Sequence, residues 1–198
     1  MTETAERIIQ NHFGCSADNL RMGAVAQIKD LDSSSIRGKR RHLMTQTRIL
    51  FVCHGNICRS AAAEVVMKQM AAEAGRKDLA VASAAATREE IGNDIYPPMK
   101  KALLGSGYVC APHAARQTTR EDYRKYDYLI GMDDENMWDM KHLYGGDPEG
   151  KLSMLMDWAG KPGREIDDPW YTRDFSGVLK QIEEGCRGLM QSIKPNEK

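Results

Sequence analysis

The stretch RILFVCHGNICRS, residues 48–60, decides how this 198-residue chain folds, because it divides into an apolar run, a turn and the start of a helix. Ile49 to Val52 is an unbroken apolar run, which is typical of a strand buried on both faces. The turn contains Gly55 and Asn56, two residue types that accept a positive φ at low cost. From Ser60 onward, a segment rich in Ala, Glu, Met, Lys and Gln predicts a helix.

A loop in this position is suited to binding an anion. Successive backbone N–H groups in a tight turn form a concave nest, and the N-terminus of the following helix adds donors and a partial positive charge. Arg59 offers a planar fork that fits two phosphate oxygens. The same positive field favours a thiolate at Cys53, which would be a nucleophile toward a bound phosphoryl group. Ser60 is placed to hydrogen-bond this sulfur and to cap the helix.

The segment CHGNICRS, residues 53–60, resembles the Cys-x5-Arg-Ser signature of the low-molecular-weight protein tyrosine phosphatases. The chain departs from the usual form with His54, where Leu or Thr is common, and with Ala61, where Pro is frequent. His54 either makes the loop more positive or lines the cleft. A purely structural cysteine is the alternative to a nucleophile. The resemblance implies that Cys53 and Arg59 are catalytic and that the substrate is bound by the rest of the loop, namely His54, Gly55, Asn56, Ile57, Cys58 and Ser60.

A second segment, IDDPWY at residues 166–171, resembles the Asp-Pro-aromatic loop of the same family. Phosphoryl transfer onto sulfur leaves a tyrosyl oxygen that needs a proton, and an Asp at the mouth of the cleft can supply it and then activate water. The resemblance assigns this role to Asp168, with Asp167 as the alternative. Trp170 and Tyr171 are expected to form an apolar wall for the aromatic substrate.

Two further segments are similar to parts of the family that support the phosphate loop. The segment HAARQ, residues 113–117, implies that His113 lies behind the loop and holds its Asn in an unusual backbone conformation. The segment MDDEN, residues 132–136, implies a hydrogen-bonding role for Asp133 near His113, and a simple helix N-cap is the alternative. The loop after residue 83 resembles the wall of the substrate cleft, to which it offers Glu89, Glu90, Ile91 and Tyr96.

The remaining pattern alternates strands with helices, which predicts an α/β fold with a parallel sheet covered on both faces. We expect four strands in the order 2-1-3-4, with the phosphate loop at the switch point of the sheet. The resemblance implies the flavodoxin-like phosphatase I fold over residues 47–195. The strands are predicted at residues 49–52, 79–83, 126–132 and 151–156, and the helices at 61–74, 98–106, 119–123, 133–143 and 175–193.

Residues 1–46 match nothing in the family and are expected to form an extension that is disordered or partly helical. Its basic segment GKRR, residues 38–41, is either a docking arm for an acidic partner or a solvated tail. Met44 resembles a natural beginning of the family domain. Translation starting at Met44 is therefore an alternative hypothesis.

Composition narrows the class of partner and the compartment. Lys plus Arg and Asp plus Glu are balanced at 28 each, so nothing argues for binding to nucleic acid or to a membrane surface. No apolar run is long enough to span a bilayer, and the N-terminus lacks the apolar centre of a signal peptide. Five cysteines without a paired framework suit the reducing cytoplasm, and their spacing is poor for a metal site. We expect no cofactor, a phosphotyrosine protein or small aryl phosphate as substrate, inorganic phosphate as product, and a monomer or weak dimer.

The second loop cysteine suggests a form of regulation. The resemblance implies a reversible disulfide between Cys53 and Cys58 that protects the nucleophile from over-oxidation, and simple packing of Cys58 is the alternative.

Three competing functions remain. Arsenate reductases of similar fold need a downstream pair of cysteines, whereas here Cys110 stands alone and Cys186 falls on the inner face of a helix. Relatives that act on arginine phosphate carry Thr at the position of Ile57, so the bulkier Ile57 favours phosphotyrosine. An idle phosphate-binding module is disfavoured by the intact set of Cys53, Arg59 and Asp168.

Overall fold

The computed structural model describes residues 46–195. The expectations for the segment before residue 46, including a start at Met44, lie outside the described residues. The elements are, in order, β1 (Thr47–Cys53), α1 (Arg59–Glu73), β2 (Leu79–Ala85), α2 (Pro97–Gly105), α3 (Arg120–Lys125), β3 (Tyr128–Gly131), α4 (Asp134–Tyr144), β4 (Leu152–Met154), the 3₁₀-helix η2 (Leu155–Ala159), α5 (Pro169–Thr172) and α6 (Phe175–Ser192).

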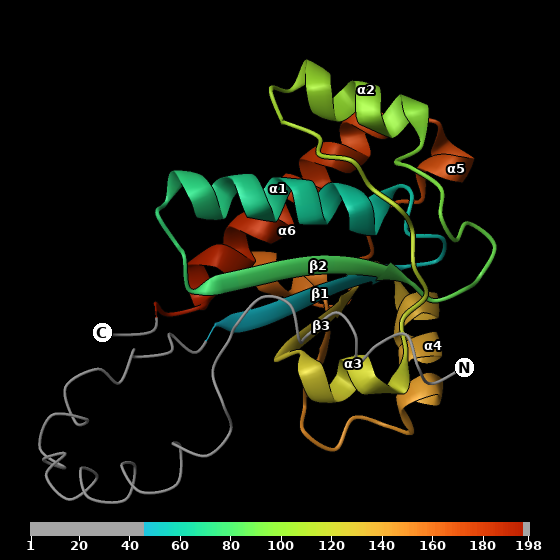
Figure 1. Ribbon diagram of the computed structural model, residues 1–198, viewed down its shortest axis with the longest axis vertical. Coiled ribbons are helices and arrows are strands. Elements are labelled where there is room, and N and C mark those ends of the chain that lie inside the picture. Colours follow the sequence, from blue (N-terminus) through green and yellow to red (C-terminus); the bar gives the residue numbers. More distant parts are fainter. Residues whose placement is uncertain (1–45, 196–198) are drawn as a thin grey trace, which may run out of the picture. The chain divides into compact units, whose positions relative to one another are not determined.

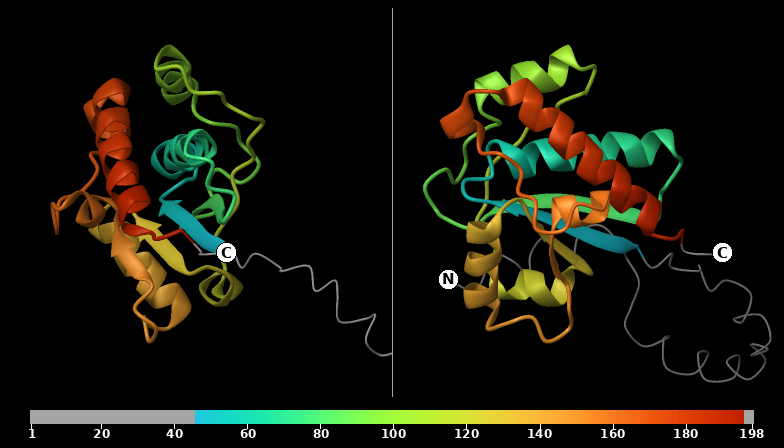
Figure 2. Two further views of the ribbon diagram at one scale, coloured as in Figure 1. Left: turned by 90° about the vertical axis from the view of Figure 1, so that its left-hand side faces the viewer. Right: turned by 180° about the vertical axis from the view of Figure 1, so that it is seen from behind.

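The four strands form one parallel sheet in the order β2-β1-β3-β4, so the predicted topology is confirmed. Helices α1, α2 and α6 lie over one face of the sheet, and α3 and α4 lie over the other (Figures 1 and 2). The chain leaving β1 and the chain leaving β3 run to opposite faces of the sheet. The loop after β1 lies beside this switch point, which is where ligands bind in sheets of this type.

Strand β1 is apolar on both faces because both faces are covered. Ile49 and Phe51 belong to the core beneath α1 and α6, whereas Leu50 and Val52 belong to the core shared with α3 and α4. The alternation follows from the two-residue period of a strand. All four side chains are fully buried, and each contributes roughly 1.5–3 kcal/mol. This burial fixes the position of Cys53, the last residue of the strand.

Several predicted boundaries were wrong, for local reasons. The fourth strand ends at Met154 rather than at residue 156, because Asp157 accepts a hydrogen bond from the Met154 backbone N–H at 3.0 Å and the chain turns into η2. The third strand begins at residue 128, since Tyr126 still caps α3. The predicted loop at 161–170 runs into α5, where Asp168 is the N-cap and Pro169 the first helical residue.

Two glycines in α6 have a packing role that the helical pattern did not indicate. A Cβ atom on Gly185 would lie 2.5 Å from Cγ of Leu155, and one on Gly188 would lie 2.1 Å from the backbone oxygen of Trp158. Both contacts are with η2. The glycines therefore allow α6 to pack closely against this turn, which offsets the cost of glycine inside a helix.

Candidate active site

The candidate site is built on the loop between β1 and α1. Cys53 ends the strand and Arg59 begins the helix, so five residues form the turn between thiol and guanidinium. Sγ of Cys53 lies 3.0 Å from Oγ of Ser60, which is the contact expected from the sequence. Ser60 is not the helix cap, however. The helix begins at Arg59, two residues earlier than the predicted 61–74, with Cys58 at the N-cap position.

Asn56 organises the loop from within. It is fully buried and has a φ of +59°, a conformation that costs most L-residues free energy. Its Nδ2 donates to Oγ of Ser60 at 3.0 Å and to Oγ of Ser83 at 2.8 Å, while its Oδ1 accepts from the Arg116 N–H at 3.2 Å. These bonds hold the strained residue, and through Ser60 they reach the sulfur of Cys53.

His113 meets the same residue from behind. Its Nε2 lies 2.7 Å from the backbone oxygen of Asn56 and must carry the proton, because a carbonyl oxygen only accepts. The expected neighbourhood of His113 and the loop Asn is thus present. Ser83 donates in turn to Glu64, which also pairs with Lys68. Sequence reasoning missed Ser83 and Glu64, although Ser83 lies near the end of β2, beside β1.

Arg59 is buried between two carboxylates. Its Nη1 donates to Oδ2 of Asp133 at 2.5 Å, and its Nη2 donates to Oδ2 of Asp168 at 2.8 Å. A longer bond of 3.3 Å joins Nη1 to the backbone oxygen of Ile166. Burial alone would lower the pKa of Arg59, but the negative charges of Cys53, Asp133 and Asp168 raise it above its ordinary value. The guanidinium is therefore firmly charged.

Asp133 is the N-cap of α4, which the sequence left open as the alternative, and its side chain bonds Arg59 rather than His113. Besides Arg59 it accepts a hydrogen bond from the Asn136 N–H at 2.7 Å, as the N-cap of α4. Within residues 46–195 the hydrogen bonds of its side chain go to these two residues and not to His113. The segment similar to the family places Asp133 at the correct edge of the sheet, but the side chain turns to the guanidinium, where opposite charges attract.

The two neighbouring candidates for the acid, Asp167 and Asp168, point in different directions. Oδ1 of Asp168 accepts from the Trp170 N–H at 2.8 Å, and its Oδ2 faces Arg59 in the cleft. Oδ2 of Asp167 instead accepts from Nε2 of Gln181 on α6 at 2.5 Å. Only Asp168 of this pair lines the cleft.

A cleft of about 330 Å³ opens above the loop. Most of the predicted substrate-binding residues line it, whereas Asn56 and Ser60 are buried beneath it. Nε2 of His54 donates to Glu89 at 3.1 Å across its rim. Ile91, one of the expected wall residues, is exposed and does not line it. The lining consists of Cys53, His54, Gly55, Ile57, Cys58, Arg59, Glu89, Glu90, Glu135, Asp168, Trp170 and Tyr171.

The four cysteines of residues 46–195 are all free thiols. Burial raises the pKa of Cys58 to about 12, and the negative charges of Cys53 and Asp168 act in the same direction. Burial also raises the pKa of Cys186, which is fully enclosed as expected for the inner face of α6. Both groups are therefore neutral thiols near pH 7.

Residues 46–195 contain neither a membrane-spanning helix nor a cluster of metal ligands. None of their helices combines the length and apolar character needed to cross a bilayer. Their His, Cys, Asp and Glu side chains nowhere form a group of three that could hold a metal ion.

Comparison with known proteins gives concordant matches. A sequence model of the family described as "Low molecular weight phosphotyrosine protein phosphatase" matches residues 48–198. The chain is 38% identical over 148 residues to low molecular weight phosphotyrosine protein phosphatase 1 of Drosophila melanogaster, covering 73% of this chain and 95% of the relative. It is 32% identical to the protein-tyrosine-phosphatase YfkJ of Bacillus subtilis, covering 74% of this chain and 95% of the relative.

Solved structures resemble the fold as well. The crystal structure of YfkJ from Bacillus subtilis matches with a TM-score of 0.73 at 31% identity, covering 77% of this chain and 98% of that one. The structure of DARP, a Drosophila arginine phosphatase, matches with a TM-score of 0.67 at 26% identity, covering 75% of this chain and 99% of that one.

Proposed function

Because the chain belongs to the low molecular weight phosphotyrosine protein phosphatase family, we propose that its cleft hydrolyses phosphotyrosine through a phosphorylated Cys53. One observation carries this proposal. A thiol, a buried guanidinium and an aspartate that reaches the guanidinium line a single cleft of about 330 Å³. Phosphoryl transfer needs a nucleophile, positive charge around the phosphate and an acid for the leaving oxygen, and these groups supply all three.

In the first step the phosphate dianion enters the nest of loop N–H groups. The thiolate of Cys53 attacks the phosphorus, so that an S–P bond forms while the P–O bond to the tyrosine breaks. Arg59 and the backbone N–H groups stabilise the charge on the equatorial oxygens. Ser60, at 3.0 Å from the sulfur, stabilises the thiolate before attack and after its release.

Asp168 supplies the proton to the leaving phenolate oxygen. The bond between its Oδ2 and Nη2 of Arg59 must first give way, because the guanidinium turns its donors to the phosphate. The freed carboxyl group then donates its proton to the leaving oxygen. After proton transfer, the Asp168 carboxylate takes a proton from the water that attacks the S–P bond. Inorganic phosphate leaves and the thiolate is restored.

Asp133 and His113 act as positioning residues in this proposal. Asp133, at the start of α4, accepts a hydrogen bond from Nη1 of Arg59. In this proposal that bond remains when the bond between Asp168 and Nη2 breaks. His113 and the side chain of Asn56 together fix the backbone whose N–H groups form the nest.

Arginine phosphate is the second candidate substrate, favoured by the likeness to the Drosophila arginine phosphatase. Ile57 lines the cleft and, by its bulk, supports phosphotyrosine instead. Release of phosphate from phosphotyrosine, p-nitrophenyl phosphate and phosphoarginine distinguishes the two, and an arsenate-dependent thiol oxidation assay tests the reductase alternative. We expect turnover of both aryl phosphates and its loss in Cys53→Ser. Substantial retained activity in that variant would refute the assigned nucleophile and leave only a binding module.

We also propose a cellular location, an active form and a redox control for the enzyme. The free thiols of residues 46–195 support a reducing cytoplasmic location. We also propose that residues 47–195 are the catalytic domain and that the active form is a monomer or weak dimer. Peroxide would oxidise the Cys53 thiolate to a sulfenic acid, releasing water. The Cys58 thiol would then displace a second water to form the disulfide, which external thiols reduce.

A further inference from the structure

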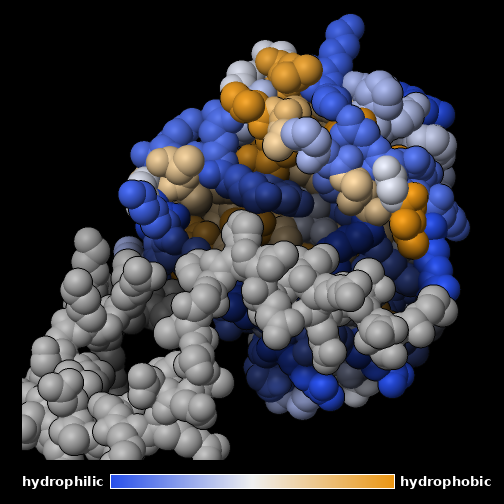
Figure 3. Space-filling model, viewed as in Figure 1, coloured by the Kyte–Doolittle hydropathy of each residue, from blue (hydrophilic) through white to orange (hydrophobic). Residues whose placement is uncertain are grey.

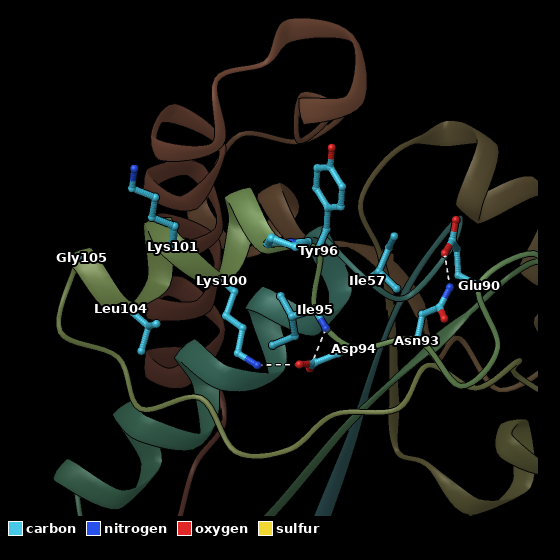
Figure 4. Close-up of a pocket in the computed structure, with 11 residues that line it drawn as sticks. Ile57, Glu90, Asn93, Asp94, Ile95, Tyr96, Lys100, Lys101, Leu104 and Gly105 are labelled. Atoms are coloured by element: carbon cyan, nitrogen blue, oxygen red, sulfur yellow. Dashed lines mark hydrogen bonds and ion pairs between the residues drawn. The ribbon is translucent and has the colours of Figure 1, made fainter.

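A second, larger hollow of about 920 Å³ adjoins the candidate active-site cleft. It runs between α2 and the chain segment 90–96 (Figure 4). Two residues, Ile57 and Glu90, line both hollows, so the two meet at these side chains. We call the larger one the α2 groove. The phosphorylated ring occupies the smaller cleft in the proposed function, and the α2 groove remains free for whatever is attached to that ring.

The floor of the groove is fixed to the phosphate loop. The Tyr96 N–H donates to the backbone oxygen of Ile57 at 2.8 Å, and the Tyr96 ring packs 5.5 Å from the ring of Trp170 in the cleft wall. Ile95 is buried, next to these residues. A ligand that lies in the groove would therefore be held in a fixed register with a phosphate bound above Cys53.

Apolar surface continues to the far end of the groove. Leu104 lines it and is 57% exposed, so its side chain is accessible to a ligand in the groove. Figure 3 shows apolar groups among charged ones at the top of that view, where α2 lies. Clefts of roughly 300–1,000 Å³ commonly enclose ligands the size of several side chains.

The groove has an acidic residue at one end, an ion pair in the middle and a lysine at the other end. Glu90 lies at the end next to the cleft, where its carboxylate accepts from Nδ2 of Asn93 at 2.7 Å. Nζ of Lys100 is neutralised by Asp94 at 2.5 Å in the middle. Lys101 lies at the opposite end from Glu90 (Figure 4), and among residues 46–195 it forms no ion pair. One cation is thus available beyond the apolar floor.

We propose that the α2 groove binds the polypeptide that flanks the phosphotyrosine, and that it selects an apolar side chain followed, farther from the phosphotyrosine, by an acidic one. The polypeptide would run over Ile57 and Ile95, its apolar side chain would lie against Leu104, and its acidic side chain would pair with Lys101. This inference rests on the proposed function. The proposed ligand is an extended polypeptide, because an apolar floor with one terminal cation suits neither the phosphates of a nucleic acid nor a lipid surface.

The test uses synthetic phosphotyrosine peptides in an alanine background, with a Leu and a Glu moved through the positions before and after the phosphotyrosine. The measurement is kcat/KM for phosphate release by the full-length chain, with p-nitrophenyl phosphate as a substrate that cannot reach the groove. At one position on one side, we expect Glu to be preferred over Lys by roughly two- to fivefold, the range of an exposed ion pair. Lys101→Glu should reverse this preference, and Leu104→Ser should weaken the preference for Leu.

Lys77→Glu is the matched control, because Lys77 is an exposed lysine at the opposite end of the sheet from the phosphate loop. It should leave the peptide preference unchanged. Peptide rates that ignore sequence, or a preference for Glu that survives Lys101→Glu, would overturn the inference while p-nitrophenyl phosphate turnover still upholds the proposed function. Dimerisation that Lys101→Glu abolishes, without any peptide preference, would make a second copy of the chain the occupant and also refute the inference. Loss of p-nitrophenyl phosphate turnover itself would instead remove the proposed function and this inference together.

Discussion

Nη1 of Arg59 donates to Oδ2 of Asp133 at 2.5 Å, and both side chains are largely shielded from solvent. Asp133 is itself fixed at the start of α4 by the N–H of Asn136. The guanidinium is thus held by one edge before any phosphate arrives. Such preorganisation lowers the cost of stabilising the charge that develops during phosphoryl transfer.

Replacing Asp133 separates its effect on Arg59 from its effect on the helix. Asp133→Asn keeps a side-chain oxygen for the N-cap but removes the charge, whereas Asp133→Ala removes both. We expect both variants to lose roughly tenfold or more in kcat/KM, since misplacing a catalytic group by about 1 Å can cost a hundredfold. Only Asp133→Ala should also lose about 1 kcal/mol of stability to thermal unfolding. Wild-type kinetics in Asp133→Asn would reduce the residue to a simple cap.

The positive φ of Asn56 gives a paired comparison within the loop. Asn56→Ala and Asn56→Gly both remove the side-chain bonds to Ser60, Ser83 and the Arg116 N–H. Glycine adopts a positive φ freely, whereas alanine pays about 1 kcal/mol for it. We expect both variants to unfold at lower temperature than wild type and to gain less thermal stability from added inorganic phosphate, with alanine the worse. Equal stability of the two variants would show that the backbone conformation is not the constraint.

Asp168→Ala should reveal the acid through its dependence on the leaving group. Phosphotyrosine leaves as a poor phenolate and needs a proton, whereas p-nitrophenolate leaves readily without one. We expect kcat on phosphotyrosine to fall by roughly 10²–10⁴-fold and kcat on p-nitrophenyl phosphate to fall much less. Asp167→Ala is the control, because Asp167 is turned toward Gln181, and it should behave as wild type. An equal loss on both substrates would count against the acid role of Asp168.

The sheet could be predicted because its signals are local. Apolar runs alternate with helical segments along the chain, and the order β2-β1-β3-β4 follows the rules for parallel sheets. The end of β4 and the short helix α5 depend on single side chains, Asp157 and Asp168, that bond backbone N–H groups nearby. The close contact of α6 with η2 joins segments far apart in the sequence, so Gly185 and Gly188 looked only tolerated.

The candidate site also has features that local sequence patterns predicted and features that they did not. The sequence segments placed Cys53, Arg59 and Asp168 in a common cleft, because each lies in a short pattern at the end of an element. They also indicated the contacts of Ser60 with Cys53 and of His113 with Asn56, but not the partner of Asp133. The side chain of Asp133 bonds Arg59 rather than His113, because its negative charge is attracted to the guanidinium. The α2 groove arises from surfaces of separate elements, and no pattern in the sequence indicated it.

Replacing Cys58 tests the proposed redox control. Peroxide should inactivate wild type reversibly and yield a Cys53–Cys58 disulfide visible by mass spectrometry after digestion. In Cys58→Ser the same treatment should produce sulfinic or sulfonic acid at Cys53 that thiols do not reverse. Cys110→Ser is the matched control, because Cys110 lies outside the lining of the cleft, and it should recover as wild type does. Full recovery of Cys58→Ser would contradict the protective role.

The most direct test of the central claim, an ionised sulfur held in an anion-binding loop, is alkylation by iodoacetate near pH 6 followed by mass spectrometry of each cysteine peptide. The account predicts that Cys53 is modified first and that inorganic phosphate protects it. Cys58, whose pKa is raised to about 12, should stay unmodified because it remains a neutral thiol at that pH. Prior modification of any other cysteine, or labelling of Cys53 that phosphate does not slow, would contradict the account.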